Sequence, residues 1–258
     1  MSTFCELDCG GEAVTLEKTD DGDIIFHGWD EETEMAAIEL GFEPSVCFEL
    51  WEGVGNINLL KKKIEYASRA GDLQLIKALI FIGVDVNKIT FASFPPLYFA
   101  VLGGNVDSVE LLLAFGANPR FDKSSALRRA AESGNHMIVE SLVKAGANLH
   151  ILDDDPLRSA ARYGYVDVVR VLIEYGANVH AKSDYAIRWA AREGCSEVVR
   201  LLLENGADAS VQNYYALRFA RKGSRGLTKV MTLRRPARCG DYVGVVDLLE
   251  AWIEEHRE

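Results

Sequence analysis

Residues 160–181 read AARYGYVDVVRVLIEYGANVHA, and close copies of this stretch recur along the chain. Within it two glycines stand twelve residues apart, at Gly164 and Gly176. The same separation is found in four further pairs: Gly71/Gly83, Gly104/Gly116, Gly134/Gly146 and Gly194/Gly206. The first two of these pairs are 33 residues apart, whereas the pairs that start at Gly134, Gly164 and Gly194 follow at steps of 30. Self-similarity at such a period predicts a protein built of stacked repeats.

Each copy predicts two short helices, each followed by a glycine that closes it in the left-handed conformation. Apolar residues recur at spacings of three and four within each helix, which makes one apolar stripe per helix. The first-helix stripe is Leu127, Ala130, Ala131; Leu157, Ala160, Ala161; and Ile187, Ala190, Ala191. The second-helix stripe is Val139, Leu142, Val143; Val169, Leu172, Ile173; and Val199, Leu202, Leu203. Because one repeat cannot bury both stripes, we expect the copies to stack.

Three segments carry a resemblance to a known family: GNVDSVELLLAFGANP from Gly104, GYVDVVRVLIEYGANVH from Gly164, and GCSEVVRLLLENGADAS from Gly194. They resemble the second half of ankyrin repeats, over roughly residues 58–254. The resemblance implies a mainly α fold, an ankyrin-repeat solenoid of about six repeats. It also implies binding of another protein through the concave and loop surfaces of the stack.

The sequence departs from the family pattern where each first helix opens. The usual Thr-Pro-Leu-His is replaced by Asp155-Pro-Leu-Arg, Tyr185-Ala-Ile-Arg and Tyr215-Ala-Leu-Arg. Asp155 followed by Pro156 is typical of a helix N-cap, and Asp184 is a candidate cap for the next helix. Since the 30-residue step removes three residues from the arm between repeats, we expect tight loops there. Short repeats of this kind resemble those common in large DNA viruses.

The two ends of the chain differ from the repeats. We expect residues 1–57 to form a small acidic α+β cap domain, with a hairpin over residues 14–27 and a helix over residues 30–40. We expect residues 58–258 to hold the repeats. The last repeat is irregular, because an insertion follows Gly223 and a first-helix pattern restarts at Thr232. Its polar end is typical of a capping repeat.

Charge separates the same two parts. Residues 1–60 contain fifteen acidic side chains and one basic one, a net charge of −14. The rest of the chain carries 24 acidic and 27 basic groups, so the total is −11. This asymmetry suggests two units with different roles. A segment within the second part, residues 209–240, contains eight Lys or Arg and no Asp or Glu. It could be a solvated face, contact an acidic protein or bind nucleic acid, and we consider nucleic acid unfavoured.

Cysteine usage and hydropathy bear on the compartment. The chain has five cysteines, an odd number, and Cys195 stands alone in its repeat. This pattern indicates a reducing environment, so we expect an intracellular, cytoplasmic protein. No run of about eighteen apolar residues predicts a membrane span. Cys5, Cys9, Cys47 and His27 could be imagined as zinc ligands, but a C-x3-C spacing without a second pair is weak. We predict no metal and no cofactor.

One arginine position repeats along the first helices, and two interpretations of it are open. The position holds Arg128, Arg158, Arg188, Arg218 and Arg234. Stacked repeats would place these side chains in a ladder, which could form a groove for an anionic ligand. Alternatively, each arginine could tie adjacent loops together through hydrogen bonds to carbonyls or to Asp. We favour the second interpretation.

Positions that vary while the framework repeats are better candidates for recognition. Trp, Tyr and Arg are the residues that most often anchor interfaces. Trp189 could instead pack between helices, an alternative that stays open. The candidate partner-binding residues are Arg129, Glu132, Arg162, Tyr163, Trp189, Arg192, Glu193 and Phe219.

No catalytic motif is recognisable in the sequence, and the repeat glycines are helix caps that bind no phosphate. We therefore predict a non-enzymatic adaptor that binds another protein and is itself a monomer. The alternative is a nucleic-acid or anionic-ligand binder that uses residues 209–240. An enzyme with an unrecognised site near the N-terminus is the least favoured hypothesis.

Overall fold

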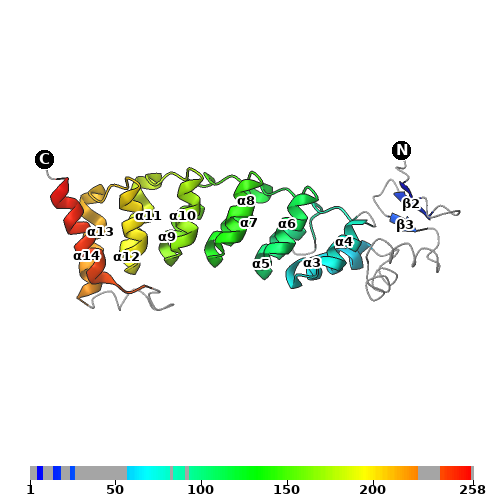
Figure 1. Cartoon of the computed structure of the whole chain (residues 1–258), viewed down its shortest axis with the longest axis horizontal. Helices are drawn as coiled ribbons and strands as arrows, with labels where there is room; N and C mark the ends of the chain where they lie inside the picture. The colour runs from blue at the N-terminus through cyan, green and yellow to red at the C-terminus, as the bar shows by residue number, and fades with distance from the viewer. Residues whose placement is uncertain are drawn as a thin grey trace. The chain divides into compact units, whose positions relative to one another are not determined.

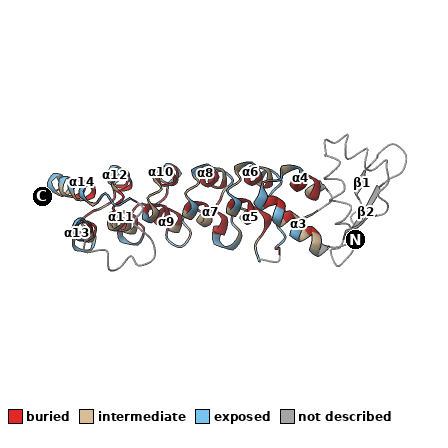
Figure 2. Cartoon of the chain, turned by 90° about the horizontal axis from the view of Figure 1, so that it is seen from below, coloured by how far each residue is buried: buried red, intermediate tan, exposed pale blue. Residues whose placement is uncertain are grey.

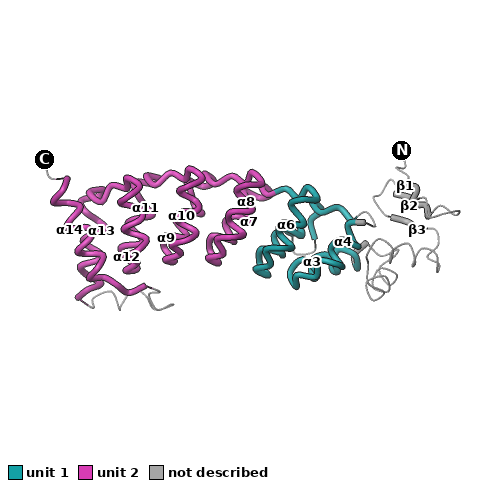
Figure 3. Tube along the Cα trace, in the orientation of Figure 1, with its two compact units in different colours: residues 1–118 teal, residues 119–258 magenta. Residues whose placement is uncertain are grey.

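The computed structural model describes residues 5–7, 14–18, 24–26, 57–81, 84–90, 93–225 and 239–256. The chain divides into two compact units, residues 1–118 and residues 119–258 (Figure 3). None of the helices in the described part of the chain combines the length and the apolar character that crossing a membrane requires. The predicted boundary at residues 57/58 stays a prediction.

Helices dominate both units (Figure 1). The first unit contains α3 (Ile57–Ala70), α4 (Leu73–Phe81), α5 (Pro96–Gly103) and α6 (Val106–Ala114). The second unit contains α7 (Phe121–Ser133), α8 (His136–Lys144), α9 (Asp155–Tyr163), α10 (Val166–Glu174), α11 (Ala181–Glu193), α12 (Ser196–Glu204), α13 (Val211–Ser224) and α14 (Tyr242–Glu255). The described helices thus form six successive pairs, which confirms the predicted mainly α repeat fold of about six repeats.

Three short strands precede the helices. They are β1 (Cys5–Leu7), β2 (Val14–Lys18) and β3 (Ile24–Phe26), and they pair antiparallel in the order β1-β2-β3. Leu16 pairs with Phe26 in the hairpin of β2 and β3, which the sequence predicted. The predicted helix over residues 30–40 lies outside the described residues, so the α+β domain as a whole stays a prediction.

Within each unit the helices form two layers (Figure 2). In the second unit the first helices α7, α9, α11 and α13 pack side by side, and α8, α10, α12 and α14 form the other layer. The predicted stripes lie between the layers. Leu127, Leu157 and Ile187 are at most 1% exposed, as are Leu142, Leu172 and Leu202. The alanine pairs of the first helices are fully buried, because neighbouring helices approach each other closely there.

The arm between repeats is replaced by a turn of left-handed backbone. Three consecutive non-glycine residues have positive φ at 122–124, 152–154, 182–184 and 212–214. The tight loops expected from the 30-residue step are therefore confirmed. Such a turn is costly, because left-handed backbone disfavours an L-residue by about 1–2 kcal/mol. Compensating contacts are required at every repeat.

Two aspartates join these turns to the following repeat. The Asp154 carboxylate accepts a hydrogen bond from the Asn178 amide at 2.9 Å, and the Asp184 carboxylate accepts one from the Asp208 amide at 2.8 Å. Both aspartates are only 4% exposed. The predicted N-cap role of Asp184 is wrong, because its own backbone lies in the left-handed turn and its side chain reaches the next repeat. Asp155 does not cap α9 either; it pairs with arginines instead.

The last repeat consists of α13 and α14, which pack against each other, while α14 also packs on α12. Residues 225–241 separate the two helices in sequence, and the predicted restart at Thr232 lies outside the described residues. Gly240 and Asp241 are hydrogen-bonded to the preceding repeat. Their amides donate to the carbonyls of Glu193 (3.3 Å) and Gly194 (2.9 Å). Hydrogen bonds from Ser196 and from the Gly244 amide hold the pKa of Asp241 below its usual range.

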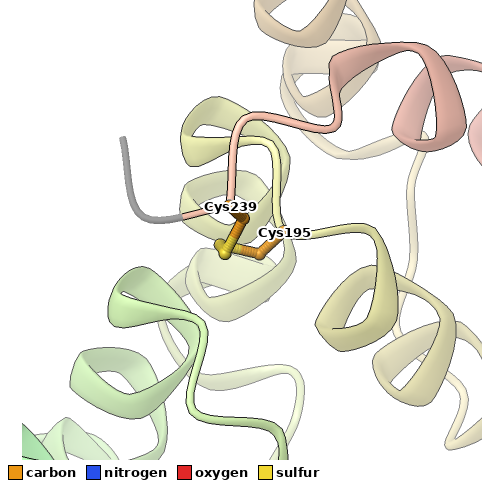
Figure 4. The surroundings of a disulfide bond; sticks show 2 residues. All are labelled: Cys195 and Cys239. Atoms are coloured by element: carbon orange, nitrogen blue, oxygen red, sulfur yellow. A yellow bond between two sulfur atoms is a disulfide. The ribbon is translucent and has the colours of Figure 1, made fainter. Parts of the chain in front are cut away.

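A disulfide between Cys195 and Cys239 joins the segment before α14 to the turn before α12 (Figure 4). The two Cα atoms are 4.9 Å apart, and Cys195 is 2% exposed. A Cβ atom at Gly164 would clash with both sulfur atoms, so a glycine is needed at this position. The interpretation of Cys195 as a lone thiol is wrong. The inference of a reducing compartment loses this support, and the cytoplasmic location stays a prediction.

Packing in the second unit predicts unequal costs for two buried leucines. Leu172 in α10 has helix neighbours on both sides, from α8 and α12, whereas Leu249 belongs to the terminal helix α14. We expect Leu172→Ala to lower the free energy of unfolding by about 2–5 kcal/mol through cavity formation. Leu249→Ala should cost less, because a terminal repeat can open without its neighbours. Chemical denaturation measures both, and equal losses would contradict nearest-neighbour stacking.

The disulfide leads to a second prediction. Proteolysis without reductant, followed by mass spectrometry, should recover two peptides joined through Cys195 and Cys239. Cys239→Ser should lower the free energy of unfolding by about 2–4 kcal/mol relative to the oxidised protein, because the cross-link restricts the unfolded chain. In excess reductant the variant and the parent protein should unfold at the same denaturant concentration. Recovery of both cysteines singly alkylated from the non-reduced protein would refute the bond.

Candidate functional site

Two arginines of the repeated position stabilise the left-handed turns at 152–154 and 182–184. Arg188 donates to the carbonyls of Lys182 (2.8 Å) and Ser183 (2.9 Å). Arg158 makes the equivalent bonds to Leu152 (2.8 Å) and Asp153 (2.9 Å). These carbonyls belong to the costly turns, so the two guanidinium groups act as clamps on them. The expected bonds to loop carbonyls are therefore found for Arg158 and Arg188, but each arginine binds its own turn; Arg188 also reaches the next turn, through Gln212 (2.7 Å).

Arg128 binds a carboxylate instead of turn carbonyls. Its Nε lies 3.3 Å from Asp155, which also pairs with Arg158 at 2.9 Å. Arg218 is exposed and lines a pocket described below, while Arg234 lies outside the described residues. Arg128, Arg158 and Arg188 thus have structural partners within the chain, and an anionic groove is not needed to explain them.

A second row runs along α9, α11 and α13 and has a different composition. It alternates cations and aromatic rings. The guanidinium carbons of Arg162 and Arg192 each lie 4.4 Å from the centroid of the Trp189 ring. Arg192 also lies 5.7 Å from the centroid of Phe219, over which the Nζ atom of Lys222 stands at 4.9 Å. Four of the eight predicted partner-binding residues therefore meet in one row.

Tyrosines connect this row to the clamping arginines. The ring of Tyr185 lies 5.6 Å from Trp189, and the ring of Tyr215 stacks on Phe219 at 4.2 Å. Arg188 stands over both tyrosines, 5.2 Å and 5.3 Å from their centroids. We call the combined surface the cation–aromatic face. Its members are Arg162, Tyr185, Trp189, Arg192, Tyr215, Phe219 and Lys222; Arg158 and Arg188 belong to the turns and contact its tyrosines.

The aromatic rings of this face are outside the core. Trp189, Phe219, Tyr185 and Tyr215 are all of intermediate exposure. Packing between helices, the alternative role of Trp189, accounts for only part of its contacts, because its ring also contacts cations and Tyr185 at the surface. Four partly exposed aromatic rings thus lie close together on the first helices of this unit.

Charge is distributed unevenly between the two layers. Helices α9, α11 and α13 contain eight basic and three acidic residues, a net charge of +5. Helices α10, α12 and α14 contain two basic and eight acidic residues, a net charge of −6. The first-helix layer thus presents positive potential in a chain whose total charge is −11.

The other predicted residues lie at the margins of this face. Arg129 and Glu132 form an ion pair of their own on α7, 3.6 Å apart. Tyr163 contacts Arg162 and the ring of Tyr165. Glu193 contributes its carbonyl to the bond with Gly240, so its backbone belongs to the terminal repeat. Tyr163 therefore adjoins the alternating row through Arg162. Arg129, Glu132 and Glu193 lie outside the contacts that define the row.

Sequence reasoning missed Tyr185, Tyr215 and Lys222 as members of the surface. The tyrosines were considered only as replacements for the family's Thr. Lys222 occupies the same repeat position as Arg162 and Arg192, 30 residues after Arg192. Extending the variable positions to the last repeat would have found Lys222.

Basic residues at the C-terminal edge of this layer are partly neutralised. A pocket of about 480 Å³ is lined by Asn213, Tyr214, Leu217, Arg218, Arg221, Glu250, Ile253 and Glu254. Arg221 pairs with Glu250 there, which lowers the affinity of the pocket for an anion. Most of the remaining basic segment, residues 226–238, lies outside the described residues.

The chemistry available on this face is recognition. Guanidinium groups stacked on aromatic rings keep their in-plane N–H donors for a carboxylate or phosphate. Within the described part of the chain, no group of three His, Cys, Asp or Glu side chains is arranged to hold a metal ion. The side chains of Cys5, Cys9, Cys47 and His27 lie outside it.

The fold defines a helical repeat protein whose first helices carry a partly exposed cation–aromatic face. A family model described as ankyrin repeats (three copies) matches residues 64–153 and 150–213. The chain belongs to the ankyrin-repeat family. Ankyrin repeats are a non-enzymatic interaction fold and generally mediate protein–protein interaction.

A curated relative shows the same family. The chain is 31% identical over 96 residues to "Ankyrin repeat, SAM and basic leucine zipper domain-containing protein 1" from Colobus guereza. The match covers 37% of this chain and 20% of the relative. Since the chain spans about a fifth of that protein's length, the likeness concerns the repeats and not the rest of the relative.

Proposed function

We propose that this protein is a non-enzymatic adaptor that binds another protein through the cation–aromatic face and the adjoining turns. Of the concave and loop surfaces that the family resemblance implies, the first-helix face of the second unit carries the proposal. The single observation behind it is the row in which Arg162, Trp189, Arg192, Phe219 and Lys222 alternate.

The types of side chain on this face favour a protein partner on energetic grounds. Aromatic and arginine side chains dominate binding energy at protein interfaces, and partly exposed rings supply large contact areas with few rotatable bonds. The rings are already held by cations and by each other, so binding orders few additional rotamers. A pre-organised surface of this kind loses little conformational entropy on association.

The nucleic-acid alternative has less support. It depended on residues 209–240, and the described part of that segment contains an ion pair between Arg221 and Glu250. We therefore keep a protein partner, a monomeric state and an intracellular location as parts of the proposal.

Two aromatic substitutions test the proposed function. The partner is first identified by affinity purification of the tagged full-length chain from its native cell and mass spectrometry. We expect Trp189→Ala and Phe219→Ala each to weaken partner binding by about tenfold or more, which is the loss of one interface anchor. The matched control is Met137→Ala, because Met137 is 53% exposed on α8, in the other helix layer.

Binding is measured by titration with the purified partner, and thermal melting establishes that each variant is folded. Retention of full affinity by folded Trp189→Ala and Phe219→Ala would refute the proposed surface. An equal loss in Met137→Ala would place recognition on the other layer and would refute it as well.

A further inference from the structure

We propose that the cation–aromatic face binds an acidic peptide segment of the partner, whose carboxylates pair with Arg162, Arg192 and Lys222. The inference rests on the proposed function and specifies the chemistry of its partner. The occupant is a stretch of Asp and Glu residues interspersed with apolar side chains. The reasoning starts from one repeat position that changes its residue type along the stack.

That position is the first residue of the four-residue openings Asp155-Pro-Leu-Arg, Tyr185-Ala-Ile-Arg and Tyr215-Ala-Leu-Arg. In the repeat of α9 it is Asp155, and this carboxylate joins Arg128 of the preceding repeat to Arg158 of its own. In the next two repeats the position holds Tyr185 and Tyr215, which contact Arg158 and Arg188 through their rings. The carboxylate present in the repeat of α9 is thus replaced by aromatic rings in the repeats of α11 and α13.

Three other cations on α9, α11 and α13 lack a carboxylate partner in the described part of the chain. Arg162, Arg192 and Lys222 contact aromatic rings but form no ion pair with a described Asp or Glu. Each lies within reach of solvent, since Arg162 and Lys222 are exposed and Arg192 is partly exposed. An acidic side chain from outside would supply these three cations with a carboxylate partner.

The stacked geometry favours carboxylates over nucleic-acid bases. Two guanidinium groups already lie over the Trp189 ring, each 4.4 Å from its centroid. Single-stranded nucleic acids bind by stacking bases on such rings, so a base would first have to displace an arginine. A carboxylate needs no displacement. It approaches the edge of the guanidinium group, where two parallel N–H donors match its oxygens.

Charge and the aromatic edges set the composition of the ligand. The net charge of +5 on α9, α11 and α13 attracts an acidic segment, and the net charge of −6 on the other layer directs it away from that side. The partly exposed rings of Tyr185, Trp189, Tyr215 and Phe219 provide apolar area between the cations. Apolar residues between the acidic ones would pack there.

The test uses the full-length chain and a fluorescein-labelled peptide rich in glutamate and leucine. The comparison peptide has glutamine in place of every glutamate. We expect the acidic peptide to bind at least about tenfold more tightly than the glutamine peptide, with an affinity that falls as salt rises. Arg192→Glu should weaken its binding by about tenfold or more. Arg200→Glu is the matched control, because Arg200 lies on α12 in the other layer, 3.8 Å from Glu197.

Four outcomes would overturn the proposal. They are equal affinity for the two peptides, equal weakening by Arg192→Glu and Arg200→Glu, tighter binding of a single-stranded oligothymidine of the same charge, and self-association that Arg192→Glu abolishes. The last outcome, seen by sedimentation of the protein alone, would make a second copy the occupant through its acidic residues 1–60.

The same variants separate this inference from the proposed function. If the natural partner is lost by Trp189→Ala but binds Arg192→Glu with unchanged affinity, the face is a protein-binding surface and the acidic ligand is refuted. If Arg192→Glu weakens the acidic peptide and the natural partner alike, both statements hold. If Arg192→Glu weakens peptide binding as expected, but neither Trp189→Ala nor Arg192→Glu changes the affinity for the natural partner, the adaptor surface lies elsewhere and the proposed function fails.

Discussion

The hydrogen bonds from Arg158 and Arg188 to the carbonyls of the left-handed turns are the interaction on which the second unit depends. A 30-residue repeat must reverse the chain within three residues of positive φ. Without compensation, such backbone costs about 1–2 kcal/mol per residue. Each arginine donates two bonds to the carbonyls of this turn, and a buried aspartate of the turn binds the amide of the following repeat. Turn, clamp and stacking therefore form one cooperative arrangement.

The clamp also determines which residues remain for recognition. The guanidinium groups of Arg158 and Arg188 bind carbonyls of their own turns. The neighbouring outward-facing positions on the first helices are therefore available for recognition. Those positions hold Trp189, Phe219 and the cations that stack on them. At the C-terminal end, the stack closes by a disulfide and by backbone bonds at Gly240 and Asp241. Framework and recognition thus occupy different positions of the same helix.

Much of this fold could be predicted from the sequence, because glycines and apolar stripes that repeat every 30 residues leave few other solutions. The helix pairs, the buried alanines and the hairpin of β2 and β3 followed from such local patterns. Asp184 was misread because a cap and a left-handed turn look alike in sequence. The bond between Cys195 and Cys239 could not be predicted, since 44 residues separate them and the intervening insertion breaks the repeat. Half of the predicted site residues meet in one row; finding Tyr185 and Tyr215 required knowing which side chains face each other across repeats.

The most direct test compares two arginines of α9, Arg158→Ala and Arg162→Ala, by chemical denaturation and by partner binding. Arg158 is 9% exposed and clamps the turn, whereas Arg162 is exposed and stacks on Trp189. We expect Arg158→Ala to lower the free energy of unfolding by about 1.5–3 kcal/mol, as loss of hydrogen bonds to a charged group does. Arg162→Ala should cost less than about 1 kcal/mol of stability and should weaken partner binding. Equal effects of the two substitutions on stability, with partner binding unaffected by Arg162→Ala, would contradict the separation of framework from recognition.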